Sequence, residues 1–466
     1  AWYTSRNSNN DSFFIGNRNS NWMLVAFGMI GTSLSGITFV SVPGTVGAGG
    51  FAYFQLVLGN LAGYMLVAFI LLPLYYKLNL SSIYNYLQQR YGPVSHKTGA
   101  LFFIVSRVLG ATARLYVVIN VLHLFILKDM DVPFGVTVFV ILLMILLYTF
   151  EGGVKTIVFT DTLQTTFMLV GLISCMLYIM HHISLSSSGI LSEMNAQGLT
   201  KIFNANPDSA SFFLKHVLGG VFITVAMTGL DQELMQKNIS VRNLKDSQKN
   251  MVTFSVIFTV VNFLFLLLGG LLYLFARKNG VTAKNDDLFP TIALRYLPTG
   301  FSIIFIIGLI SALFPSADGA LTALTSSYCI DILGLKKRDD LNEAQRKKVR
   351  LRVHFTFAVI FFLAVMVFKW IDNKSIIDVI LKVAGFTYGP LLGLFAFGIL
   401  TKRQINDKAS IYVCLIAPLL IIILDYLNHS TGVFGSFKIG YELLIYNGLL
   451  TFAGLWLISK KTNGTY

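Results

Sequence analysis

The chain has 466 residues, of which 55% are hydrophobic and only 12% are charged, and its mean hydropathy is +0.69. A soluble protein of this length carries about 25% charged residues, so the composition excludes an ordinary soluble protein and indicates a polytopic membrane protein. The net charge of +14 does not indicate nucleic-acid binding, because the basic residues lie in short loops between apolar segments.

Apolar stretches of membrane-spanning length recur along the whole chain. A helix needs about 20 such residues to cross a bilayer, and we count about twelve spans. They lie at 21–43, 51–76, 98–127, 134–150, 156–183, 212–230, 251–276, 300–330, 353–370, 375–400, 409–427 and 441–459. The segment Leu78–Tyr91 is too polar to cross and is expected to lie on the membrane surface. The polar stretch Ser184–Ser211 predicts a long exposed loop.

The distribution of basic residues predicts the orientation of the spans. Cytoplasmic loops carry an excess of Lys and Arg, and one set of alternate loops, together with both termini, holds most of these residues. That side includes Lys237, which we predict to be a loop residue after the sixth span. It also includes the cluster Lys336–Arg352, which we expect to touch anionic head groups. We therefore expect a multi-pass protein of the cell inner (plasma) membrane with this side in the cytoplasm.

The first span does not have the pattern of a lipid-facing helix. Its stretch Gly28–Gly44 (GMIGTSLSGITFVSVPG) is rich in glycine and hydroxyl residues and ends in Pro-Gly. Unpaired backbone groups cost several kcal/mol in hydrocarbon, so irregular backbone occurs only inside protein or beside a water-filled cavity. A glycine-interrupted span of this kind indicates a transporter binding site near the midplane. The alternative is a helix–helix contact made by small residues.

The chain shows a repeat of five spans. Spans one to five and six to ten can be superposed, and the sixth opens with a second glycine-interrupted stretch, Gly219–Gly229. Because five is odd, the two halves have opposite topology, the inverted-repeat plan with its site between the broken helices. The predicted divisions are 1–18 (end of a leading helix and cytoplasmic linker), 19–183 (first repeat), 184–211 (extracellular loop), 212–403 (second repeat) and 404–466 (two accessory spans and tail).

Four motifs in order resemble the sodium/solute symporter family: Glu151–Gln164 (EGGVKTIVFTDTLQ), Ser82–Gly92 (SIYNYLQQRYG), Asp231–Lys237 (DQELMQK) and Ser311–Asp331 (SALFPSADGALTALTSSYCID). The resemblance implies an all-α, leucine-transporter-like core of five plus five helices in inverted repeats. Its first and sixth core helices are broken, accessory helices follow at the C-terminal end, and solute uptake is driven by sodium. Family members carry one helix before the core, and Ala1–Ser5 is expected to be its end.

The resemblance also implies a first sodium site. Its ligands fall on Gly31 and Leu34 in the first core helix and on Ala312, Pro315 and Ser316 in the eighth. Sodium, as a small hard cation, prefers oxygen ligands. Pro315 departs from the hydroxyl residue usual in the family, but it frees a carbonyl one turn back by removing a helix hydrogen bond.

Two intramembrane carboxylates suggest a second sodium site. Asp318 lies deep in a span, where a carboxylate indicates function, and Asp161 matches the aspartate that some relatives use with this face of the eighth helix. The alternatives are that Asp318 pairs with Lys382 or an arginine, and that Asp161 has a helix-terminal role.

The candidate substrate residues lie on and beside the broken helices. Hydroxyls follow the first break, an aromatic and an amide residue begin the second span, and two residues occupy the second break. These are Ser33, Ser35, Thr38, Phe51, Gln55, Thr224 and Met227. The stretch SLSGITFVSVPG resembles the family branch that carries sialic and monocarboxylic acids more than the sugar branch, which has acidic and amide residues after the break.

Two arginines in the third span are further substrate candidates. Arg107 and Arg114 are seven residues apart, hence on one helix face. Buried arginine is costly, and its planar guanidinium suits a carboxylate. The two side chains are equally compatible with binding an organic anion and with pairing an aspartate or a helix C-terminus.

These features predict a sodium-coupled symporter that imports a small organic solute, carboxylated and of the sialic-acid or monocarboxylate type, by alternating access. One or two sodium ions are co-transported. The alternatives are a sugar symporter of the same family and a membrane sensor or channel-like subunit without accumulation. The sequence has no Walker motif, zinc spacing or Ser-His-Asp arrangement, so an enzyme is not expected. The expected partners are the solute, sodium and the lipid bilayer, with no nucleic acid and no obligatory protein partner.

Overall fold

The computed structural model describes residue 13 and residues 18–183, 186–371 and 376–461. These residues are almost entirely helical, which confirms the all-α prediction. The strand pair in this part of the chain is β1 (Gln404–Ile405) with β2 (Ser459–Lys460), which are antiparallel. Residues 1–12 and 14–17, which include the expected end of a leading helix, lie outside the described residues, as do the side chains at 150–156 in the first motif.

The helices of the first half begin with a broken pair. They are α3 (Trp22–Ser33), α4 (Gly36–Gly49), α5 (Tyr53–Leu66), α6 (Leu72–Lys77), α7 (Asn85–Arg90), α8 (Pro93–Leu122), α9 (Phe134–Ile183) and α10 (Ser187–Ala196). α5 and α6 are joined without a gap by a π-helical turn, and α8 continues through another to Met130. The segment predicted to lie on the surface contains the short helix α7.

The second half also begins with a broken pair. Its helices are α11 (Phe213–Thr224), α12 (Gln232–Ile239), α13 (Leu244–Lys278), α14 (Leu288–Arg295), α15 (Thr299–Ser327), α16 (Glu343–Ile371), α17 (Ile376–Thr387), α18 (Gly389–Leu400), α19 (Asp407–Ser430) and α20 (Leu443–Leu457). The π-helical turn Val225–Gly229 extends α11 toward α12.

Among the described residues, seven helices are long and apolar enough to cross a membrane, and three bent pairs bring the number to 10. Two shorter apolar helices, Phe134–Thr149 within α9 and Leu443–Leu457, account for the remaining predicted spans. The bends are 57° between α3 and α4 and 65° between α11 and α12, so the breaks predicted in the first and sixth core helices are confirmed. A third bend, 44° between α17 and α18, was not predicted.

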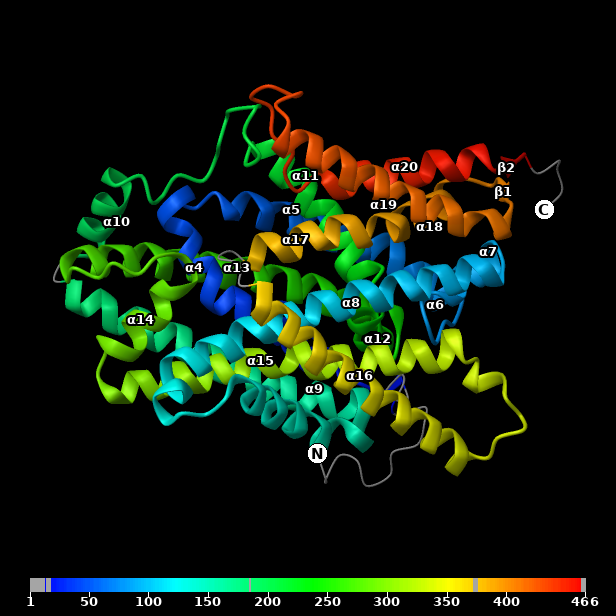
Figure 1. The fold of residues 1–466 in the computed structure, drawn as a ribbon, viewed down its shortest axis with the longest axis horizontal. Coiled ribbons are helices and arrows are strands. Elements are labelled where there is room, and N and C mark those ends of the chain that lie inside the picture. Colours follow the sequence, from blue (N-terminus) through cyan, green and yellow to red (C-terminus); the bar gives the residue numbers. More distant parts are fainter. Residues whose placement is uncertain (1–12, 14–17, 184–185, 372–375, 462–466) are drawn as a thin grey trace.

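The long helices run side by side along the long axis of the molecule (Figure 1). Helices α10 and α14 lie at the left end of the view, and α7, β1 and β2 lie at the right end. The left end corresponds to the predicted outer side and the right end to the predicted cytoplasmic side. A bundle of this kind satisfies the backbone hydrogen bonds within each span, as a bilayer requires.

The two broken spans meet at the centre and at the cytoplasmic end of the bundle. Helix α3 packs against α9, α13 and α15, and α12 contacts both α3 and α15. Just before α3, the Ser20 amide donates to the Ser240 carbonyl oxygen at 3.0 Å, directly after α12. This contact fixes the inner halves of the two broken spans side by side. The inverted-repeat relation and the domain boundaries remain predictions.

Candidate substrate and sodium site

The break in the first span leaves backbone carbonyls free. Helix α3 ends at Ser33, Leu34 has φ −88° and ψ 70°, and Ser35 is extended before α4 begins. The Leu34 amide donates to the Ile30 carbonyl oxygen at 2.7 Å. Among the described residues, no backbone amide is recorded donating to the carbonyl oxygens of Gly31 or Leu34. These are the two oxygens that the sequence assigns to sodium.

Helix α15 faces this break. A methyl group built on Gly31 would lie 3.4 Å from Cγ of Pro315, so α3 and α15 are in contact there. Pro315 has no amide, which frees the carbonyl one turn back. Ser316 is buried and its hydroxyl donates to the Leu313 carbonyl oxygen at 3.0 Å, so its oxygen can still accept or ligate. With Ala312 fully buried on the same face, the arrangement is compatible with the predicted first sodium site.

The two intramembrane carboxylates lie on the packed pair α9 and α15, each with partners of its own. Asp161 is fully buried and pairs with Lys237, its Oδ2 atom lying 2.6 Å from the Lys237 Nζ atom. Asp318 is also fully buried and accepts a hydrogen bond from the Tyr148 hydroxyl at 2.6 Å. Lys382, considered as a partner for Asp318, pairs with Asp425 at 2.5 Å instead.

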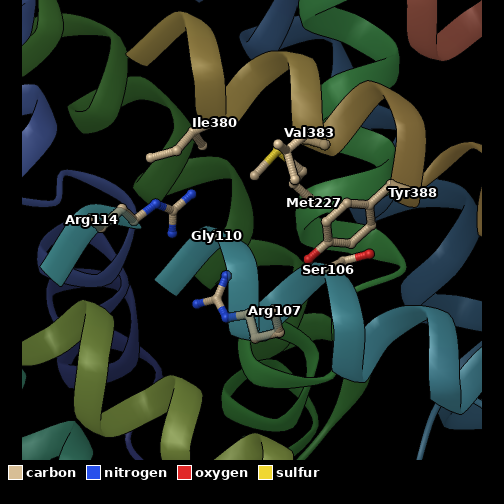
Figure 2. Close-up of a pocket in the computed structure, with 9 residues that line it drawn as sticks. Ser106, Arg107, Gly110, Arg114, Met227, Ile380, Val383 and Tyr388 are labelled. Atoms are coloured by element: carbon tan, nitrogen blue, oxygen red, sulfur yellow. The ribbon is translucent and has the colours of Figure 1, made fainter. Parts of the chain in front are cut away.

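A closed pocket lies between α8, α17 and the break of the sixth span. Figure 2 shows Arg107 and Arg114 on α8, facing the helix that carries Ile380 and Val383. The complete lining is Ser106, Arg107, Gly110, Arg114, Met227, Ile380, Val383, Ala384 and Tyr388. The cavity is about 10 Å³, room for about one water molecule. In this conformation the pocket does not accommodate a solute.

The two arginines differ in their partners. Arg107 is 3% exposed and forms an ion pair with Glu233 through its Nη2 atom. Its Nη1 atom lies 3.6 Å from Oδ2 of Asp231. Asp231 in turn accepts a hydrogen bond from the Tyr388 hydroxyl at 2.6 Å. Arg114 is half-buried, and no hydrogen bond or ion pair is recorded for its guanidinium within the described part of the chain. Of the two guanidinium groups at this pocket, that of Arg114 is therefore the one without a directly bonded carboxylate among the described residues.

The sequence profile described as "Sodium:solute symporter family" matches residues 13–416. The chain belongs to the sodium:solute symporter family. It is 21% identical to a sodium/sialic acid symporter of Proteus mirabilis over 97% of this chain and 91% of that protein. It is 23% identical to a sodium/sialic acid symporter of Aliivibrio fischeri, over 88% of this chain and 81% of that protein. It is 20% identical to the sodium/glucose cotransporter 1 of Ovis aries, over 90% of this chain and 68% of that protein.

A solved structure of a Na⁺-coupled sialic acid symporter, in a substrate-bound outward-open state, shares the fold with a TM-score of 0.84 and 19% identity. The match covers 98% of this chain and 93% of that chain. The predicted family and the leucine-transporter-like fold class are thereby confirmed, and sodium is the coupling ion expected of a family member. The family is one of transporters, and this chain is a multi-pass membrane protein.

The other predicted substrate residues of this symporter lie around the breaks and toward the outer side. Among them, Met227 lines the pocket, and Ser33 is half-buried at the end of α3. Three more are buried on the broken spans: Ser35, Thr38 and Thr224. Gln55 donates to the Ser211 carbonyl oxygen at 3.3 Å and so holds the outer loop, while Phe51 packs on the ring of Phe263. Neither Gln55 nor Phe51 lines the pocket between α8 and α17.

The placement of Lys237 in a cytoplasmic loop was wrong. Helix α12 continues the sixth span beyond residue 230, and Lys237 is 3% exposed within it. Its pairing with Asp161 makes this burial tolerable, because a buried charge requires an opposite partner. The signal available in the sequence was the motif Asp231–Lys237, which also contains Glu233, the partner of Arg107. Tyr148 and Tyr388 carried no comparable signal.

Proposed function

We propose that this chain is a sodium-coupled symporter that imports a small carboxylated solute, of the sialic-acid or monocarboxylate type, across the plasma membrane by alternating access. The observation that carries the proposal is the Arg114 guanidinium, which lines a buried pocket beside the sixth-span break without a partner in the described part of the chain. The names of the sialic acid symporters it resembles agree with this substrate class.

The chemistry of the pocket favours a solute with a carboxylate and an apolar part. A charge removed from water and left unpaired is costly, so an arginine in this position favours an anionic ligand. The planar guanidinium binds a carboxylate through two parallel hydrogen bonds. On the facing helix, Ile380 and Val383 offer an apolar wall to the remainder of the solute.

The proposed sodium ion binds between the break of α3 and the facing helix α15. The ligands are the carbonyl oxygens of Gly31, Leu34 and Ala312, the hydroxyl of Ser316, and the carbonyl oxygen that Pro315 releases one turn back. An ion in this position joins the first broken span to α15, which links sodium binding to the arrangement of the two helices. Each tenfold difference in sodium concentration across the membrane supplies about 1.4 kcal/mol per ion.

Entry of the solute requires α17 to move away from α8, since the pocket between them is closed. The bend of 44° between α17 and α18, at the Tyr388–Gly389 junction, is a position where such a movement can occur. Larger cavities lie on both sides, one of about 690 Å³ at the predicted outer end and one of about 370 Å³ at the predicted cytoplasmic end. Alternating access would connect the central pocket to each of them in turn.

The test is uptake into proteoliposomes with an inward sodium gradient, compared with a potassium gradient. The solutes are N-acetylneuraminic acid, pyruvate, glucose and myo-inositol, because relatives that carry sialic acid, glucose and inositol are all similar to this chain. We expect sodium-dependent accumulation of a carboxylated solute. Preferred uptake of an uncharged sugar would contradict the proposed carboxylated substrate. Binding of a solute without its accumulation would contradict symport.

A further inference from the structure

Lys237 places a positive charge inside the bundle, beside the two intramembrane carboxylates. Its Nζ atom lies 2.6 Å from Oδ2 of Asp161 and 2.5 Å from the Thr32 hydroxyl oxygen. Thr32 also donates to the same Asp161 oxygen at 3.2 Å. Lys237 is on α12, Thr32 on α3 and Asp161 on α9, so this contact joins the inner halves of both broken spans to a helix of the surrounding bundle.

From this contact we infer that the Lys237 ammonium occupies, as a tethered cation, the second cation position that Asp161 and Asp318 would otherwise offer to a sodium ion. The symporter then couples one sodium ion to each solute. The statement about coupling rests on the proposed function, whereas the occupation of the position by Lys237 does not. With Lys237 in this position, the second sodium ion that the two carboxylates led us to expect is not bound.

Three of the four carboxylate oxygens at this position already accept hydrogen bonds from protein groups. A hard cation such as sodium requires about five or six oxygen ligands. Oδ2 of Asp161 is already bonded to Lys237 and Thr32, which leaves Oδ1 as a buried oxygen without a recorded partner. The Asp318 oxygens accept from the Tyr148 hydroxyl at 2.6 Å and from the Gly319 amide at 2.5 Å.

On α15, the residues next to Asp318 on this face add no hydroxyl, whereas Thr322, one turn further along, has a buried hydroxyl without a recorded partner. Pro315 has no hydroxyl, Gly319 has no side chain, and between them Asp318 is already bonded. A cation is nevertheless needed, because Asp161 would be a buried and unbalanced charge without one. The lysine supplies that charge permanently, and its ammonium group donates hydrogen bonds to oxygens that would otherwise coordinate a metal ion.

A structural ion pair and a tethered cation make different predictions. If Lys237 only stabilises the fold, its removal changes stability but not the number of sodium ions bound. If it fills a cation position, its removal opens that position to sodium. A further consequence is that one sodium ion with a singly charged carboxylate carries no net charge across the membrane.

The experiment counts sodium ions bound per molecule of the purified full chain, using radiolabelled sodium at saturation and no solute. The decisive quantity is the difference in bound sodium ions per molecule between Lys237→Gln and the wild type. We expect the variant to bind one additional ion. An unchanged number would overturn the inference. The wild-type number separately tests the proposed function, for which we expect one ion; a chain that binds none is not sodium-coupled.

A second variant covers the case in which Lys237→Gln does not fold. In Lys237→Gln/Asp161→Asn both members of the ion pair are neutralised together, so neither is left without its partner, and the wild-type number of ions is expected. Loss of one ion in this variant would show that Asp161 holds a sodium ion in the wild type and would overturn the inference. The matched control is Lys245→Gln, an exposed lysine at the start of α13, which should leave the number unchanged.

Discussion

Replacing Arg114 with Gln tests the proposed carboxylate site directly. Hydrogen bonds to charged groups contribute about 1.5–3 kcal/mol each, and a bidentate contact would provide two. Their loss corresponds to a solute affinity lower by about 100-fold or more, since each 1.4 kcal/mol is about tenfold. Arg114 has no recorded partner in the described part of the chain, so no protein carboxylate is left unpaired by its removal. We expect the unfolding temperature to stay within about 2 °C of the wild type.

The matched variant is Arg107→Gln, two helix turns away on the same face. Arg107 pairs with Glu233 and lies 3.6 Å from Asp231. Removing one partner of a buried ion pair costs about 3–5 kcal/mol of stability. The unfolding temperature of this variant should therefore fall by several degrees. The structure thus predicts opposite outcomes for two arginines that the sequence does not distinguish.

The assay combines sodium-driven solute uptake in proteoliposomes with thermal unfolding of the same purified proteins. Arg114→Lys should recover part of the uptake lost in Arg114→Gln, because the charge is restored without the planar geometry. The reasoning is refuted if Arg114→Gln transports a carboxylated solute with wild-type affinity. It is equally refuted if Arg114→Gln is the less stable of the two glutamine variants.

Three further predictions concern the helices around the breaks. Ser316→Ala should weaken sodium affinity roughly tenfold without unfolding the protein, since one hydroxyl ligand worth about 1.4 kcal/mol is lost; unchanged sodium dependence of uptake would argue against the first sodium site. Gly31→Ala should lower stability by about 1–3 kcal/mol, because its methyl group would overlap the Thr165 hydroxyl; Thr165→Ala in the same chain should recover part of the loss in a thermal-shift measurement. Tyr388→Phe removes the hydrogen bond to Asp231 and should lower stability by about 1.5–3 kcal/mol, which equal unfolding temperatures would contradict.

The sequence alone determined the membrane class, the spans and the two central breaks of this symporter. Each of these follows from local composition, because a bilayer requires long apolar helices and tolerates irregular backbone only where protein or water surrounds it. The stretch Gly28–Gly44 therefore predicted its own break, and the structure bends there by 57°. The order of four motifs was enough to identify the family.

The tertiary structure decided which charged groups are paired. Arg107 and Arg114 share a helix face, yet the carboxylates that distinguish them are Glu233 and Asp231, more than a hundred residues away in the chain. Lys237 has the sequence context of a loop lysine, and its partner Asp161 lies 76 residues earlier. The free energy of a buried charge depends on groups that other helices bring within hydrogen-bond distance. Hydropathy along the chain measures where a residue can be buried, whereas the partner that makes its burial stable is set by the packing of α3, α8, α9 and α12.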